Sequence, residues 1–170
     1  FPESSHRRNN LGLADRVKKA IDEGAEVIDI GGQSTRPGHT PVDELQEWQR
    51  LQRPIDLIKS RFDVPLSVDT YYPYVAKNAL ISGADMINDV WGLQYDKDGE
   101  MAQIIAKHGA AVCIMQNQNH ISPDEMLWSD IFDFLQRSIS IAKSAGISDE
   151  KIILDGGIGF GKNKEQNFKD

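Results

Sequence analysis

The stretch Gly24-Ala25-Glu26-Val27-Ile28-Asp29-Ile30-Gly31-Gly32 contains the unit that decides the fold. A helical pattern ends at Gly24, a short apolar run follows, and polar and glycine-rich sequence comes next. Glycine suits the left-handed conformation that commonly closes a helix. The unit recurs after Gly83, Gly109 and, more loosely, Gly146, and one more apolar run follows a helical segment. These runs predict five strands, at Val27–Ile30, Val64–Val68, Met86–Ile87, Ala111–Met115 and Lys151–Leu154.

Segments with the apolar spacing of amphipathic helices lie between the runs. They are Leu11–Glu23, Val42–Ser60, Pro73–Ser82, Glu100–His108 and Glu125–Ala145. Because each strand is almost continuously apolar and alternates with a helix, the pattern predicts an α/β fold with a parallel sheet under helical cover. A doubly wound open sheet and a (β/α)8 TIM barrel both fit, and spacing does not separate them.

No linker rich in Gly, Ser or Pro divides the chain, so residues 1–170 are expected to form a single domain. A closed barrel of this class typically needs about 250 residues. If the fold is a barrel, the domain is therefore incomplete, with the first strand before Phe1 and the last two strands after Asp170. Both ends are expected to be cuts through a longer chain.

Composition narrows the function classes. The chain has 39% hydrophobic and 26% charged residues, as in globular proteins, and a net charge of −7. This charge argues against general affinity for nucleic acid or anionic membranes. Small molecules are therefore the expected class of ligand. No apolar run approaches the roughly 20 residues of a membrane span. The one cysteine, Cys113, excludes an internal disulfide. Its apolar neighbours predict a buried reduced thiol, which favours a cytoplasmic location.

Every apolar run ends in polar or glycine-rich sequence, and parallel strands place these ends on the face where ligands bind. A single Asp there is more often a helix cap or a turn residue, and Asp29 and Asp89 are expected to be structural. The set of Asp69, Asn88 and Asp155 together suggests a ligand-binding site. A carboxylate accepts two parallel hydrogen bonds from an amidine-like edge, and an amide supplies a donor and an acceptor. The set therefore matches a fused aminopyrimidinone ring.

Two glycine-rich segments resemble anion-binding loops, and the sequence signal is stronger for the first than for the second. The loop 31–38 combines glycines, hydroxyls and Arg36, which suits a phosphate, although an exposed surface turn fits the composition equally well. Gly156–Lys162 has the spacing of a nucleotide-binding P-loop, but Asn163 stands where Ser or Thr is needed. The dinucleotide fingerprint fails as well. A metal held by the carboxylates is disfavoured because no close histidine pair accompanies them.

Four segments, in their order and spacing, resemble the motifs of dihydropteroate synthases. They are Asp29-Ile-Gly-Gly-Gln-Ser-Thr-Arg-Pro-Gly38, Ser67-Val-Asp-Thr70, Ile87-Asn-Asp89 and Leu154-Asp-Gly-Gly-Ile-Gly-Phe-Gly-Lys162. The resemblance covers essentially the whole chain. It implies a TIM barrel that condenses p-aminobenzoate with 6-hydroxymethyl-7,8-dihydropterin pyrophosphate, giving 7,8-dihydropteroate and pyrophosphate in folate biosynthesis.

The resemblance also implies roles for individual residues. The pterin edge is bound by Asp69, Asn88 and Asp155, and Met115 and Phe160 pack on the ring. The loop residues Ser34, Thr35, Arg36 and Pro37 lie near p-aminobenzoate and the pyrophosphate, and Asp69 and Arg36 are the expected catalytic residues. Magnesium is expected on the substrate pyrophosphate, with no metal ligands in this chain. Proteins of the family are often homodimers and are the target of sulfonamides.

The chain departs from the family pattern at two positions, one inside the last matched segment and one after Met115. Gly156 stands where the family usually has Pro, and Gln116 follows Met115 where the family commonly has His. The family's later lysine and Arg-x-His motifs fall outside these residues. Two rival hypotheses remain: a corrinoid-dependent, pterin-binding methyltransferase domain and a non-catalytic pterin-binding fragment. The loop 34–38 favours the synthase over the methyltransferase, since a methyl donor has no pyrophosphate to hold.

Overall fold

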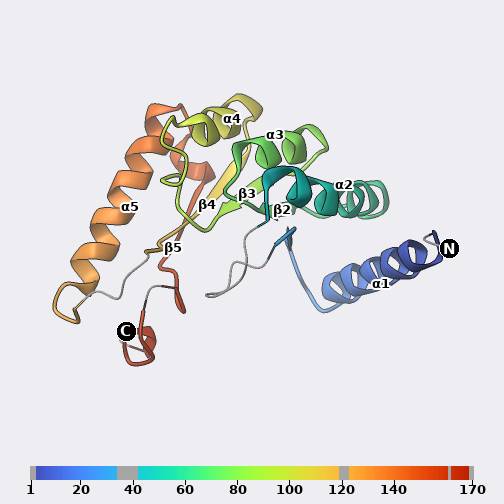
Figure 1. Ribbon diagram of the computed structural model, residues 1–170, viewed down its shortest axis with the longest axis horizontal. Helices are drawn as coiled ribbons and strands as arrows, with labels where there is room; N and C mark the ends of the chain where they lie inside the picture. Colours follow the sequence, from blue (N-terminus) through green and yellow to red (C-terminus); the bar gives the residue numbers. More distant parts are fainter. Residues whose placement is uncertain (1–2, 34–41, 119–122, 161, 169–170) are drawn as a thin grey trace.

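The computed structural model describes residues 3–33, 42–118, 123–160 and 162–168. Its centre is one parallel sheet whose five strands lie in chain order, β1-β2-β3-β4-β5 (Figure 1). The strands are β1 Ile28–Gly31, β2 Leu66–Asp69, β3 Met86–Asp89, β4 Ala111–Met115 and β5 Ile152–Asp155. A doubly wound sheet reverses its strand order at a switch point, and this sheet does not. The order is that of successive βα units of a TIM barrel.

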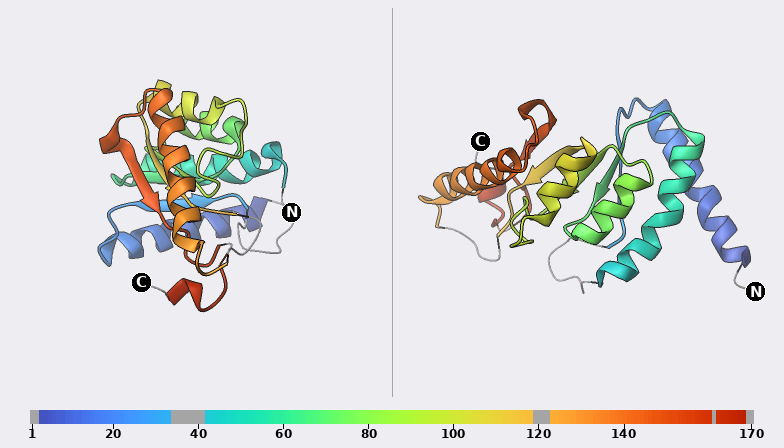
Figure 2. Two further views of the ribbon diagram at one scale, coloured as in Figure 1. Left: turned by 90° about the vertical axis from the view of Figure 1, so that its left-hand side faces the viewer. Right: turned by 90° about the horizontal axis from the view of Figure 1, so that it is seen from above.

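The helices occupy the predicted intervals. They are α1 Glu3–Asp22, α2 Glu44–Arg61, α3 Pro73–Ile81, α4 Glu100–His108 and α5 Leu127–Ser144, and two short 3-10 turns cover Asp149–Lys151 and Gln166–Phe168. Seen from above, α2 to α5 follow one another along the sheet (Figure 2). The first helix begins at Glu3 rather than at the predicted Leu11. Residues 3–10 are entirely polar, so apolar periodicity could not reveal that part of the helix.

The core lies between the helices and one face of the sheet. Alternate strand residues point to this face. Those of β2, β3 and β4 are fully buried: Leu66, Val68, Ile87, Val112 and Ile114. They pack against helix residues such as Ile55, Ile105 and Ala142. The helix-ending glycines predicted from sequence do adopt positive φ, for example 101° at Gly83 and 62° at Gly109.

The other face of the sheet carries Asp29, Ser67, Asp69, Asn88 and Cys113, by the alternation of the same strands. Cys113 corrects the sequence prediction of a buried thiol, because it is only half-buried on this second face. Except for β4, the strands also end later than predicted. Asp69, Asn88 and Asp155 belong to the strands themselves rather than to the loops that follow.

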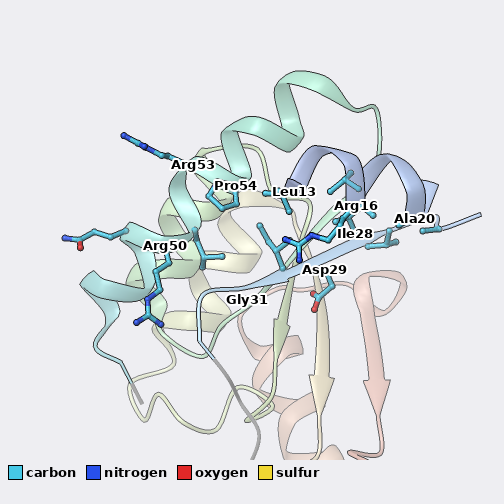
Figure 3. Close-up of a pocket in the computed structure, with 15 residues that line it drawn as sticks. Leu13, Arg16, Ala20, Ile28, Asp29, Gly31, Arg50, Arg53 and Pro54 are labelled. Carbon is cyan, nitrogen blue, oxygen red and sulfur yellow. The ribbon is translucent and has the colours of Figure 1, made fainter. Parts of the chain in front are cut away.

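The edge strand β1 borders a groove between α1 and α2 (Figure 3). Its lining includes Leu13, Arg16, Ile28, Asp29 and Arg53. It lies on the side of β1 away from β2, and Asp69 does not line it. Within the described residues, none of the helices combines the length and apolarity needed to cross a membrane.

Candidate functional site

Asp69 and Asn88 lie side by side at the C-terminal ends of neighbouring strands. They are paired positions in the parallel register of β2 and β3. Since paired residues of parallel strands point to the same face, the carboxylate and the amide share the face opposite the helices. Asn88 is in turn paired with Cys113 of β4. The structure therefore brings together two of the three residues predicted to bind a flat polar ring edge.

The Asp69 carboxylate is in an unusual electrostatic environment. Its Oδ1 atom is buried and has no hydrogen-bond partner among the described residues. Burial, followed by repulsion from Asp29, Glu47 and Asp89, raises the pKa of Asp69 from 3.8 to about 7. A buried carboxylate with a free acceptor and a pKa near neutrality is typical of a ligand-binding or catalytic group rather than a structural one.

Glu47 is a site residue that sequence reasoning missed. It lies on the buried side of α2 with Leu51, Ile55 and Ile58, and its side chain is fully inaccessible. Burial raises its pKa. An available signal was its helical spacing, because Glu47 occupies a position in the apolar stripe of the helix. Gln33 donates a hydrogen bond from Nε2 to Glu47 Oε2.

Gln33 joins the two ends of the segment 34–41. Its Oε1 accepts a hydrogen bond from the backbone N–H of Val42 at 3.3 Å, while its Nε2 contacts Glu47. The hydroxyl of Tyr72, from the loop after β2, donates to Val42 O at 2.9 Å. The predicted loop residues Ser34, Thr35, Arg36 and Pro37 lie outside the described residues, so their roles stay predictions.

Asp155, Met115 and Phe160 form the second part of the site. Asp155 ends β5 and is paired with Met115 of β4, on the same face as Asn88 and Cys113. Met115 is 5% exposed and belongs to an apolar cluster with Tyr71 and Val90, against which Phe160 packs. The structure thus brings Met115 and Phe160 together, as the shared ring contact predicted from sequence requires. One strand, β4, separates Asp155 from Asn88.

Lys162 belongs to the loop after β5, and its hydrogen bonds to described residues all go to neutral oxygens. Its ammonium donates to Gln116 Oε1 at 2.5 Å, to Gly157 O at 2.8 Å and to Phe160 O at 3.1 Å. Burial lowers the pKa of Lys162, and Asp155 opposes this shift. An ammonium has three N–H donors, and these contacts use all of them. This arrangement differs from a nucleotide-binding P-loop, whose lysine points at phosphates.

Asp89 has a structural role. The sequence predicts such a role for both Asp29 and Asp89. Asp89 is 1% exposed, and its two oxygens accept the backbone N–H groups of Trp91 and Leu93, at 2.8 and 2.9 Å. Burial nevertheless raises the pKa of Asp89 to about 6. Asp29 is different, because it is exposed on the open face and adds negative charge near Asp69. Its expected structural role has no hydrogen bond to support it among the described contacts.

Three tyrosines flank the site and were not predicted. The rings of Tyr71 and Tyr72 lie 4.5 Å apart, as do those of Tyr71 and Tyr95. They come from the loops that follow β2 and β3. Among the described residues, no group of three or more His, Cys, Asp or Glu side chains is arranged to hold a metal ion.

The carboxylates at the strand ends and the nearby aromatic and apolar side chains can together bind a flat, polar, partly cationic ring.

Comparison with known sequences assigns nearly the whole chain to one family. Residues 1–169 match the family model described as pterin binding enzyme. The chain is 48% identical over 162 residues to a dihydropteroate synthase of Clostridium beijerinckii, covering 95% of this chain and 59% of that protein. It is 42% identical over 152 residues to the Bacillus subtilis dihydropteroate synthase, covering 89% of this chain and 52% of that one. The chain thus spans little more than half the length of these relatives.

Solved structures give the same result. The dihydropteroate synthase of Clostridium difficile, determined in the presence of pteroic acid, superposes with a TM-score of 0.88 at 48% identity. The alignment covers 95% of this chain and 61% of that one. The enzyme of Xanthomonas albilineans, determined with 4-aminobenzoic acid, gives a TM-score of 0.83 at 34% identity, covering 91% and 55%.

Proposed function

The chain belongs to the pterin-binding enzyme family, and on that premise we propose that it is the pterin-binding part of a dihydropteroate synthase. The whole protein would condense p-aminobenzoate with 6-hydroxymethyl-7,8-dihydropterin pyrophosphate. The observation that carries the proposal is the pairing of Asp69 with Asn88 on one face of the sheet, with Asp155 at the end of β5 on the same face. The 48% identity to a dihydropteroate synthase supports it.

The pterin ring would bind along the strand ends. Its amino and ring N–H groups are donors, and the carboxylates of Asp69 and Asp155 are the matching acceptors. The Asn88 amide can pair with a neighbouring donor and acceptor on the ring. Met115 and Phe160, which already pack in one cluster, would contact the ring face. The Oδ1 atom of Asp69, which has no hydrogen-bond partner among the described residues, supports this pose because a ligand donor would satisfy it.

In the reaction, the bond between the pterin methylene carbon and the pyrophosphate oxygen breaks first. Pyrophosphate leaves with the bonding electrons, and the methylene becomes cationic. The p-aminobenzoate nitrogen then forms a bond to this carbon and loses a proton to water. Ionised Asp69 would stabilise the cation, since its carboxylate is largely buried and charges interact more strongly where they are less exposed to water. Arg36 would bind the departing pyrophosphate, with Ser34, Thr35 and Pro37 shaping the same loop.

Magnesium would reach the site with the pyrophosphate. The described residues offer no three-ligand cluster, and Mg²⁺ commonly binds substrate phosphates through few protein ligands. The p-aminobenzoate site would also bind sulfonamides, and homodimerisation and a cytoplasmic location belong to the same proposal.

A non-catalytic pterin-binding fragment is the second candidate function. The chain spans 59% of the length of its Clostridium beijerinckii relative. An assay of dihydropteroate formation separates the two. We expect no product from the 170-residue chain alone and product from a protein that continues this sequence to the relatives' length. If the longer protein binds a pterin but forms no dihydropteroate, the synthase proposal is wrong.

A further inference from the structure

The Lys162 ammonium is committed to the loop that follows β5. Its acceptors are the side-chain oxygen of Gln116 and the backbone oxygens of Gly157 and Phe160, at 2.5, 2.8 and 3.1 Å. Since an ammonium has three N–H groups, no donor is left for a substrate oxygen. The cation therefore acts on the conformation of its own loop.

Gly157 connects this cation to Asp155. The Gly157 carbonyl accepts from Lys162, and the Gly157 N–H donates to Asp155 Oδ1 at 2.8 Å. The residue is thus held on both sides of its α-carbon. Its φ of 67° is in the left-handed region, and an added Cβ would lie 1.9 Å from Gln116 O. A chain held this tightly fixes the oxygen of Asp155 that it contacts.

Gln116 holds the same loop from the end of β4. Its backbone N–H donates to Asp155 O at 2.9 Å, and its side-chain Oε1 accepts from Lys162. The side chain is fully buried, so both contacts are shielded from water. Gln116 is also the position at which this chain departs from the Met-His pattern of the family. A neutral imidazole and an amide oxygen can both accept from an ammonium, but only the amide keeps this acceptor at every ordinary pH.

We propose that Lys162 and Gln116 are positioning residues for Asp155: together they clamp Gly157, whose N–H orients the Asp155 carboxylate toward the pterin. The role assigned to Asp155 rests on the proposed function. The clamp itself rests on the contacts of Lys162, Gly157 and Gln116 described above. The second oxygen of Asp155, Oδ2, accepts no hydrogen bond from the described residues and would receive a ligand donor.

The test uses Lys162→Met, which keeps much of the side-chain length and removes every donor. Lys164→Met is the matched control, because Lys164 is exposed in the same loop. Calorimetry with a pterin analogue and amide hydrogen exchange at Gly157 are measured for each, with the midpoint of thermal unfolding to confirm folding. We expect Lys162→Met to weaken pterin binding about tenfold, equal to about 1.4 kcal/mol, and to speed exchange at Gly157. Lys164→Met should change neither.

A second variant separates positioning from general support. Gln116→Leu removes the other side of the clamp, and the double variant with Lys162→Met completes a cycle. If the two residues act as one clamp, the double variant loses little more affinity than either single variant. Additive losses, or wild-type affinity and exchange in Lys162→Met, would overturn the inference. Absence of pterin binding by the unchanged protein would instead overturn the proposed function, and exchange at Gly157 would still decide whether the clamp exists.

Discussion

Asp69 and Glu47 each bury one carboxylate oxygen that has no hydrogen-bond partner among the described residues. They come from different elements, β2 and α2, and the charge of Glu47 helps to raise the pKa of Asp69. Two buried acceptors of like charge destabilise the free protein. A donor-rich ligand on the face that carries Asp69 would relieve the cost at Asp69, whereas Glu47 stays on the buried side of α2. The stability of the protein should therefore depend on pH in the range where Asp69 titrates.

We predict that the free energy of unfolding falls as the pH rises from about 4 to about 7. The folded state raises the pKa of Asp69 from 3.8 to about 7, so it binds more protons than the unfolded chain within that range. The slope cannot exceed about 1.4 kcal/mol per pH unit for one group. Urea unfolding at several pH values measures it, and Asp69→Asn should flatten it. Asp89 and Glu47, whose pKa values burial also raises, contribute to the slope of both proteins, so the difference between the two slopes reports on Asp69. An unchanged slope in Asp69→Asn would contradict the assignment.

Gln33→Leu should lower stability and impair turnover. The substitution leaves Glu47 Oε2 and the Val42 N–H without Gln33, and a lost buried contact of this kind costs about 1–3 kcal/mol. The two ends of the segment 34–41 also lose their bridge. Because the carboxylates proposed to bind the pterin, Asp69 and Asp155, are unchanged, kcat should fall more than pterin affinity. Gln52→Leu is the control, since Gln52 is exposed on the same helix as Glu47. Equal losses in both variants would argue against a bridging role.

Arg36→Ala should reduce turnover more than it reduces pterin binding. Arginine is suited to a pyrophosphate oxygen pair, which matters while the leaving group departs. Steady-state kinetics in the full-length protein, with calorimetry for the pterin analogue, make the comparison. A methyltransferase of the same fold has no pyrophosphate to stabilise. If Arg36→Ala weakens pterin binding as much as turnover, the pyrophosphate role is wrong.

Asp155→Asn should weaken pterin binding while the loop stays folded. The amide oxygen of the new side chain can still accept from the Gly157 N–H, which lies 2.8 Å from Asp155 Oδ1 in the unchanged protein. Its NH2 group, however, replaces an acceptor with a donor. The unmatched pair costs about 1–3 kcal/mol of affinity. Calorimetry measures the loss, and hydrogen exchange at Gly157 should match the wild type. Unchanged affinity would remove Asp155 from the pterin site.

The sequence identified the polar residues at the strand ends, although not the exact strand limits, and it did not reveal the buried residues beside them. Asp69 and Asn88 could be found because parallel strands bring their C-terminal ends to one face, whatever the details of packing. Asp89 and Asn88 are adjacent in sequence, yet alternation sends them to opposite faces, and Asp89 binds backbone N–H groups of its own loop. Glu47 escaped notice because a glutamate in a helix is usually solvated. Such buried pairings depend on distant contacts that periodicity does not encode.

Two adjacent glycines in the loop after β5, Gly156 and Gly157, should respond differently to substitution by alanine. Gly157→Ala should destabilise the loop after β5, because its φ of 67° is unfavourable for alanine and the new Cβ would lie 1.9 Å from Gln116 O. Gly156→Ala should be nearly neutral, because no heavy atom lies within 4 Å of its added Cβ and its φ is not in the left-handed region. Alanine also restricts the unfolded chain at both positions equally, so the difference reports on the folded state.

Gly157→Ala must also displace Gln116 or its own strand end, which moves Asp155 and the acceptor of Lys162. We therefore expect its thermal midpoint to fall by several degrees relative to Gly156→Ala, and its affinity for a pterin analogue to fall with it. Gly156→Pro introduces the residue that the family usually has at position 156, which is the control position of this comparison. If Gly157→Ala and Gly156→Ala melt and bind alike, the loop after β5 relaxes freely, and Asp155 is not held by its contact with Gly157.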